Sequence, residues 1–271
     1  MRKVVDSNYL QDMKLDTFLS SNVNNYVVLT DYAAMEAYKG DTLKSIYKSM
    51  SIVTRFPDQV LILKSTLIVC GLKSNAKGMQ KRLIDSSQTK DFYVFCKQLK
   101  CAEHGSTAHQ SPLLEHGKAA TEHIDSMLND AAGIIDAISE ISKEYSKEEL
   151  KIFRTRSQSY TQDMIGKVKK HILILSTSLF KNHPNTSNKY NIVELGGTYI
   201  FRYSLCCYLL TLDWISHGGA NGVNDKRIRN DIVDMTFVAY ATFFDGLLTN
   251  DSKASSIYKE AMFILRRVSH A

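Results

Sequence analysis

Short apolar segments that lead into an acidic residue occur near both ends of this 271-residue chain, and they constrain the fold more than any other feature. Val4 and Val5 come directly before Asp6, and residues 246–249 are followed, one residue later, by Asp251. Helix-like sequence follows both segments. Because alternating strands and helices build parallel sheets, we expect strands from both ends of the chain to pair in one parallel sheet.

The remaining local signals give a coarse secondary structure. Residues 3–5, 26–29 and 246–249 predict strands, whereas residues 59–69 form an apolar run that fits either a strand or a buried helix. Thr30 or Asp31 is expected to cap the helix after the second strand. The predicted helices begin near residues 9 and 41, cover 32–38, 164–180, 198–214 and 231–240, and end at about residue 268.

The middle of the chain has a different character from its ends. Apolar residues recur at helical spacing from Ser111-Pro112 to Ile141, which predicts a long amphipathic helix. Only three prolines occur, so no proline-rich linker divides the chain. We therefore predict an α/β fold in which 1–72 and 191–271 form one parallel-sheet domain. Residues 73–190 would be a mostly helical insertion that projects from it.

Acidic residues cluster locally in a chain whose net charge is +6. Carboxylates that converge repel one another unless a cation lies between them. Asp6 and Asp251 follow predicted strands, Glu36 lies early in a predicted helix, and Asp231 and Asp234 are three residues apart near a helix start. The carboxyl ends of parallel strands face one crevice. The sequence thus predicts that these side chains meet, although more than two hundred residues separate the first from the last.

The order of these acids and their flanking residues resembles the PIN-like family of metal-dependent nucleases. The matching segments are Val4-Val5-Asp6-Ser7-Asn8, Glu36 in an early helix, Asp234 followed by the small residues Ala239 and Ala241, and Thr249-Asn250-Asp251. They cover about ninety residues at the two ends of the chain. The resemblance implies a PIN-like parallel-sheet sandwich and a catalytic set of Asp6, Glu36, Asp234 and Asp251.

The residue types suit the chemistry that the resemblance implies. Mg²⁺ and Mn²⁺ prefer oxygen ligands, and such a cation neutralises a phosphodiester and activates water. Asp6, Asp234 and Asp251 are the expected metal ligands, direct or through water. Glu36 would bind a second metal or orient the attacking water. Asp231 is an alternative to Asp234 as the aspartate of the third matching segment, or it caps its helix.

Polar and basic residues near the acids complete the predicted site. Ser7, Asn8 and Thr249 would support the ligands by hydrogen bonding. Four basic residues lie close to these acids in the sequence: Lys226, Arg227, Arg229 and Lys253. Their side chains could bind phosphates on either side of the cleaved phosphodiester bond. The expected partner is nucleic acid, and the preference for RNA over DNA comes from the resemblance alone.

Cysteine usage and the first residues bear on the compartment. The five cysteines are an odd number, and only Val4 and Val5 separate Lys3 from Asp6, which is too short for the apolar part of a secretory leader. We expect free thiols and a cytoplasmic protein with no membrane partner. The series Cys96, Cys101, His104 and His109 lacks the spacing typical of a zinc site.

The leading hypothesis is a metal-dependent endonuclease, most readily an endoribonuclease, which could serve as a toxin or defence effector. The alternative is a PIN-like module that binds nucleic acid or protein without cutting. The helical insertion could bind substrate, form a homo-oligomer or hold an inhibitory protein partner.

Overall fold

The computed structural model describes residues 1–40, 42–73, 78–126, 131–155, 160–186, 192–219 and 225–268. Its four strands are β1 (Arg2–Val5), β2 (Tyr26–Leu29), β3 (Val60–Ile62) and β4 (Leu247–Leu248). The helices are α1 (Met13–Ser20), α2 (Asp31–Tyr38), α3 (Leu43–Met50), α4 (Thr66–Cys70), α5 (Met79–Leu83), α6 (Ser86–Glu103), α7 (Thr107–Ser126), α8 (Ala131–Ser142), α9 (Lys147–Thr155), α10 (Gln162–Asn182), α11 (Tyr199–Ser216), α12 (Asp225–Ala241) and α13 (Ser252–Val268). Short 3-10 helices cover Ser7–Gln11, Val53–Arg55, Pro57–Gln59 and Ile192–Gly197.

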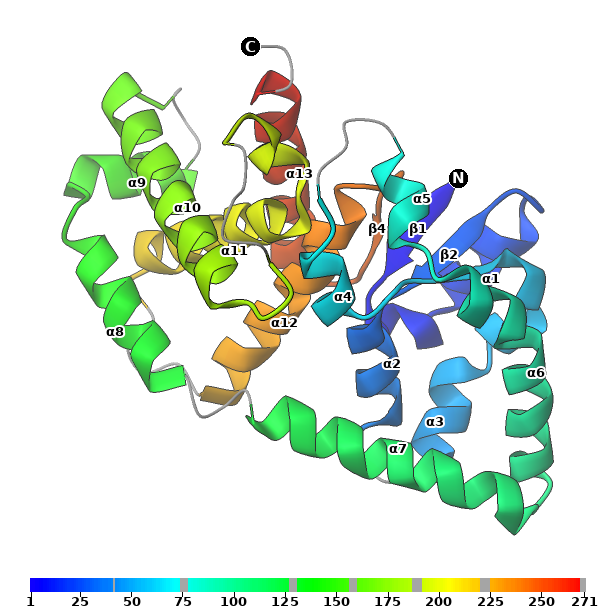
Figure 1. The fold of residues 1–271 in the computed structure, drawn as a ribbon. Helices are drawn as coiled ribbons and strands as arrows, with labels where there is room; N and C mark the ends of the chain where they lie inside the picture. The colour runs from blue at the N-terminus through cyan, green and yellow to red at the C-terminus, as the bar shows by residue number, and fades with distance from the viewer. Residues whose placement is uncertain are drawn as a thin grey trace.

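The strands form one parallel sheet in the order β3-β2-β1-β4. The central strand β1 pairs with β2 on one side and with β4, from the far end of the chain, on the other (Figure 1). Val4 is opposite Val28 in β2 and Leu247 in β4. The predicted parallel sheet with strands from both ends is therefore confirmed, and the chain has the predicted α/β class.

Helices pack against both faces of this sheet. Val4 and Val28 point into a core shared with α11, α12 and α13, whereas Val5 and Val27 point into a second core shared with α1, α3, α6 and α7. Alternate residues of a strand face opposite sides, and both sides are apolar here because both are covered. For this reason the strands appear in the sequence as continuous apolar segments.

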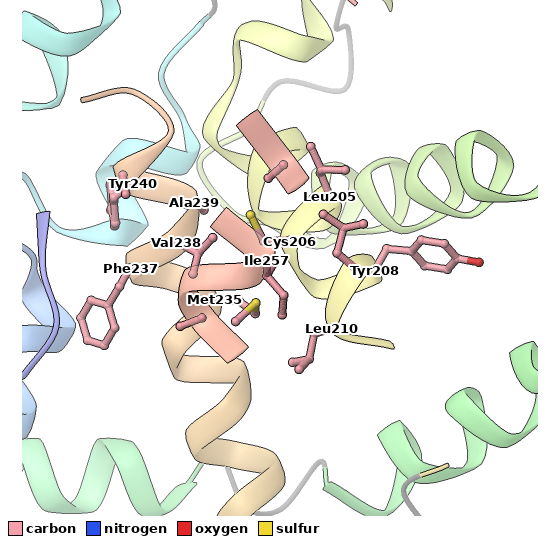
Figure 2. Close-up of a cluster of buried hydrophobic side chains, with 14 of the residues drawn as sticks. Leu205, Cys206, Tyr208, Leu210, Met235, Phe237, Val238, Ala239, Tyr240 and Ile257 are labelled. Carbon is pink, nitrogen blue, oxygen red and sulfur yellow. The ribbon is translucent and has the colours of Figure 1, made fainter. Parts of the chain in front are cut away.

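The larger core lies between α11, α12 and α13 (Figure 2). Cys206 of α11, Val238 of α12 and Ile257 of α13 are all almost completely buried. Cys206 is fully buried and is a free cysteine. This core fixes α12 beside β1, and that placement determines where the acidic residues of α12 lie.

The middle of the chain is helical, but part of the predicted insertion belongs to the sheet domain's core. Phe92 and Leu99 of α6 and Leu113 of α7 are buried with the residues of β2. The expectation that residues 73–190 project from the sheet is therefore wrong for α6, which contacts β3, and for α7, which runs beneath α2 and α3 (Figure 1). In the described residues, no helix combines the length and the apolar character needed to cross a membrane.

Two helix predictions need correction. The stretch from Ser111 to Ile141 holds two helices, α7 and α8; α7 begins at Thr107, and Pro112 lies inside it. Met127 and Leu128 of that stretch lie outside the described residues, as does Asp41 at the predicted start of the third helix. The helix α12 begins at Asp225 rather than near Asp231. Other boundaries agree within a few residues, including the cap of α2, where the Thr30 side chain accepts from the Ala33 amide.

Candidate active site

The carboxyl ends of β1 and β4 bring the two ends of the chain together. The Asp6 amide donates to the Leu248 carbonyl oxygen at 2.9 Å, which continues the pairing of the strands by one residue. Beyond that point the Thr249 hydroxyl donates to Asp6 Oδ2 at 2.8 Å and accepts from the Asp251 amide at 3.0 Å. Asp6 and Asp251 are thus tied to the same threonine, although 244 residues separate them.

Glu36 reaches the same place from α2. The Ser7 hydroxyl lies between Asp6 Oδ1, at 3.3 Å, and Glu36 Oε2, to which it donates. A hydroxyl has one hydrogen to share, so the two carboxyl groups compete for it unless one of them carries a proton. Burial, opposed in part by hydrogen bonds, raises the pKa of both Asp6 and Glu36, which favours such a shared proton.

Asp234 of α12 lies near the other acids of the group. Burial is the largest cause of its raised pKa of about 8, followed by the charges of Asp6, Glu36, Asp251 and Asp231. These four carboxylates therefore lie close enough to Asp234 to raise its pKa. Among the described residues, no hydrogen bond or ion pair reaches the Asp234 carboxylate, in contrast to the other acids of the group. The structure therefore brings together all four acids that the sequence singles out.

Asp231 has a different role from the one expected. Because α12 begins at Asp225, Asp231 lies within the helix and cannot be its N-terminal cap. Its Oδ2 accepts from Lys253 Nζ at 2.5 Å and from Trp214 Nε1 at 3.1 Å. Lys253 Nζ also lies 6.0 Å from the centre of the Trp214 ring. The buried Asp231 charge is thus neutralised by an ion pair that joins α11, α12 and α13.

Of the three predicted supporting residues, Ser7 and Thr249 contact Asp6 through their hydroxyl groups, whereas Asn8 is exposed and contacts Asp6 only through its backbone amide. The Asn8 amide donates to Asp6 Oδ1 at 3.3 Å, so Asp6 caps the 3-10 helix Ser7–Gln11. Asp251 caps α13 in the same way, because its Oδ1 accepts from the Ala254 amide at 2.7 Å. Each aspartate therefore has a structural role at a chain turn, and each also lies near enough to Asp234 for its charge to raise the pKa of Asp234.

The four predicted basic residues divide into two kinds. Lys226 and Arg227 are exposed at the start of α12. Arg229 is buried, and its Nη1 donates to Asp125 of α7 at 3.0 Å. Its charge also lowers the pKa of Glu36, in opposition to the larger effect of burial. Arg229 thus links α7 to the acidic group, a contact that the sequence did not reveal.

The acidic group has the ligand chemistry of the metal that the resemblance implies. All five acids offer oxygen, the ligand type that Mg²⁺ and Mn²⁺ prefer. In the part of the chain that the structure describes, no three His, Cys, Asp or Glu side chains are arranged so that they could hold one ion directly. Mg²⁺ usually keeps several waters and binds one or two carboxylates, so the group fits a hydrated ion better than a fully coordinated one.

Comparison of the chain with family models, with curated proteins and with solved structures finds no match.

Proposed function

We propose that this protein is a divalent-metal-dependent endonuclease of PIN-like fold that hydrolyses phosphodiester bonds, in RNA more readily than in DNA. One observation carries the proposal: the charges of four nearby carboxylates and burial raise the pKa of Asp234 to about 8, and no hydrogen bond or ion pair from a described residue reaches its carboxylate. Repulsion of this kind disfavours the charged acid, and a divalent cation turns it into attraction. Perturbed carboxyl groups that converge at a sheet end are also typical of functional sites.

The residues that would hold Mg²⁺ or Mn²⁺ are Asp6, Asp234 and Asp251, directly or through water. Asp251 uses Oδ1 to cap α13, and its Oδ2 accepts no hydrogen bond from the described residues. Thr249 fixes the orientation of Asp6, which is how supporting groups commonly orient metal ligands. When bound, the cation would offset the charge of a phosphodiester and make a nearby water more acidic.

Glu36 is the proposed general base. Its pKa is raised by burial and by Asp6, which brings it closer to the pH range in which a base can accept a proton from water. The Ser7 hydroxyl contacts both Glu36 and Asp6, so it can orient a water or a phosphate oxygen between them. Lys226 and Arg227 at the exposed start of α12 would bind phosphates beyond the scissile bond, and Arg229 and Lys253 would offset charge nearer to the acids.

The experiment is cleavage of end-labelled single-stranded RNA and DNA in Mn²⁺, in Mg²⁺ and in EDTA. The wild-type protein should cut RNA in the presence of either metal and not in EDTA. Asp234→Asn should abolish cleavage. Asp136→Asn, at an exposed position of α8, makes the same chemical change away from the acidic group and should cut like wild type.

Two outcomes would overturn the proposal. Cleavage by Asp234→Asn at the wild-type rate would remove the acidic group from the reaction. Binding of RNA without cleavage in any metal would favour the non-catalytic binding module. Growth arrest on expression that Asp6→Asn relieves would in addition support a role as a toxin or defence effector.

A further inference from the structure

The outer face of α6 carries basic side chains around a single tyrosine. Lys90, Tyr93, Lys97, Lys100 and His104 follow one another at spacings of three or four residues, which places them on one side of the helix. All five are exposed, Tyr93 by 53%, and Lys97 Nζ lies 4.5 Å from the centre of the Tyr93 ring. Together these five residues form the α6 basic face.

The opposite side of α6 holds this face in place. Phe92 and Leu99 are buried in the core that also contains Tyr9 and Leu10 of the 3-10 helix after Asp6. The helix also contacts β3, α3 and α7. Because both structures share one packed core, the α6 basic face has a fixed position relative to the acidic group.

The charge of the α6 basic face is not neutralised within the described chain. None of its lysines forms an ion pair with a described residue. Of the two acids of the helix, Asp91 lies 100° or more around the helix from each of the three lysines, at about 100° per residue. Glu103 is three residues after Lys100 but forms no ion pair with it. Asp91 is moreover within 3.4 Å of the Ser87 hydroxyl. The face therefore attracts an anionic partner.

We propose that the α6 basic face binds single-stranded nucleic acid, with phosphates at the three lysines and a base stacked on Tyr93. The three lysines span about 15 Å along the helix, so they can contact more than one phosphate of the same strand. Proteins that bind single strands combine cations that follow the backbone with aromatic rings that stack on bases. As a contact for substrate the inference rests on the proposed function, but binding at this face does not depend on cleavage.

The test measures binding of a fluorescent single-stranded RNA of about 12 nucleotides, and of the matching DNA, by anisotropy. EDTA is present throughout, so the measurement is independent of catalysis. The logarithm of the binding constant is plotted against the logarithm of the KCl concentration. Each lost phosphate contact should reduce the slope by about 0.7 for a single strand, so the triple variant K90Q/K97Q/K100Q should lose about 2.

The tyrosine is tested separately. Tyr93→Ala should weaken binding about tenfold or more through lost stacking, whereas Tyr93→Phe, which keeps the ring, should bind like wild type. The control K147Q/K151Q/K169Q removes three exposed lysines from α9 and α10 and should leave the slope close to that of wild type. Melting temperatures of all variants establish that each is folded.

The outcomes separate this inference from the proposed function. The proposal that the α6 basic face binds nucleic acid would be overturned by any of three results, even if the protein cuts RNA in Mn²⁺. These results are a wild-type slope in K90Q/K97Q/K100Q, an equal loss of slope in the control variant, or no binding by the full chain. If binding depends on Tyr93 and the three lysines but no metal supports cleavage, the binding proposal for the α6 basic face would be supported and the proposed nuclease function would be overturned.

Discussion

Replacement of Asp234 by asparagine should stabilise the metal-free protein while it abolishes cleavage. The pKa of this carboxyl group is raised from 3.8 to about 8 by burial and by four neighbouring carboxylates. Between these values the folded state retains a proton that the unfolded state has released. Stability therefore falls as the pH rises through this window, by about 1.4 kcal/mol per pH unit. At neutral pH, about three units above 3.8, the loss is roughly 4 kcal/mol as an upper bound.

The measured effect should be smaller than this bound. The Asp234 side chain is only partly shielded from solvent, and its neighbours can move apart, so an expected gain for Asp234→Asn is about 2 kcal/mol at neutral pH. For a chain of this size such a gain raises the melting temperature by about 5 °C. Asparagine resembles the protonated acid, so the difference should be small near pH 4 and should vanish only well below 3.8, where Asp234 is protonated in both states. Thermal unfolding in EDTA from pH 4 to pH 9 measures this dependence.

Asp231→Asn is the matched control, because it lies one helical turn away and makes the same change. Asp231 accepts from Lys253 and Trp214, so its replacement should lower the melting temperature rather than raise it. Mn²⁺ at millimolar concentration should stabilise wild type and have little effect on Asp234→Asn, since a ligand stabilises only the state that binds it. An Asp234→Asn protein that melts below wild type in EDTA at neutral pH would refute the reasoning. A difference that is constant from pH 4 to pH 9 would do the same.

Two further substitutions test the supporting residues. Thr249→Val removes the hydroxyl that donates to Asp6 at 2.8 Å, so affinity for Mn²⁺ should fall about 10- to 100-fold by calorimetry, and Thr249→Ser should restore it. Unchanged affinity in the valine variant would show that Thr249 does not orient a ligand. Arg229→Met removes a charge that lowers the pKa of Glu36. That pKa should rise, and the acidic limb of the pH–rate profile for cleavage should move to higher pH, because a base acts in its ionised form. A limb that stays in place would exclude Glu36 as the base.

The sheet could be predicted from the sequence because its strands are buried on both faces. Residues 26–29 form a continuous apolar run, and the structure places β2 at Tyr26–Leu29. Residues 59–69 fit either a strand or a helix, and the structure contains both, with β3 ending at Ile62 and α4 beginning at Thr66. Leu63, Lys64 and Ser65 lie between them. A local apolar pattern could not locate that turn, because none of the three residues is a strong breaker of structure.

The start of α12 was missed for a different reason. Lys226, Arg227, Arg229 and Asn230 read as a polar loop before a helix, yet they lie in its first two turns. Arg229 is buried there because it pairs with Asp125, which is 104 residues away in the sequence. A charge that is compensated across such a distance leaves no trace in a local pattern.

The same limit explains why Asp231 and Asp234 could not be separated from the sequence on chemical grounds. They lie three residues apart on one helix, both are acidic, and only the register of the PIN-like resemblance favoured Asp234. The structure distinguishes them by their partners. Asp231 meets Lys253, which the first turn of α13 supplies only because β4 places that helix beside α12. Asp234 meets four acids and, among the described residues, no cation. Since one carboxylate is neutralised by the protein and the other is not, the second is the one whose charge a metal ion would have to balance.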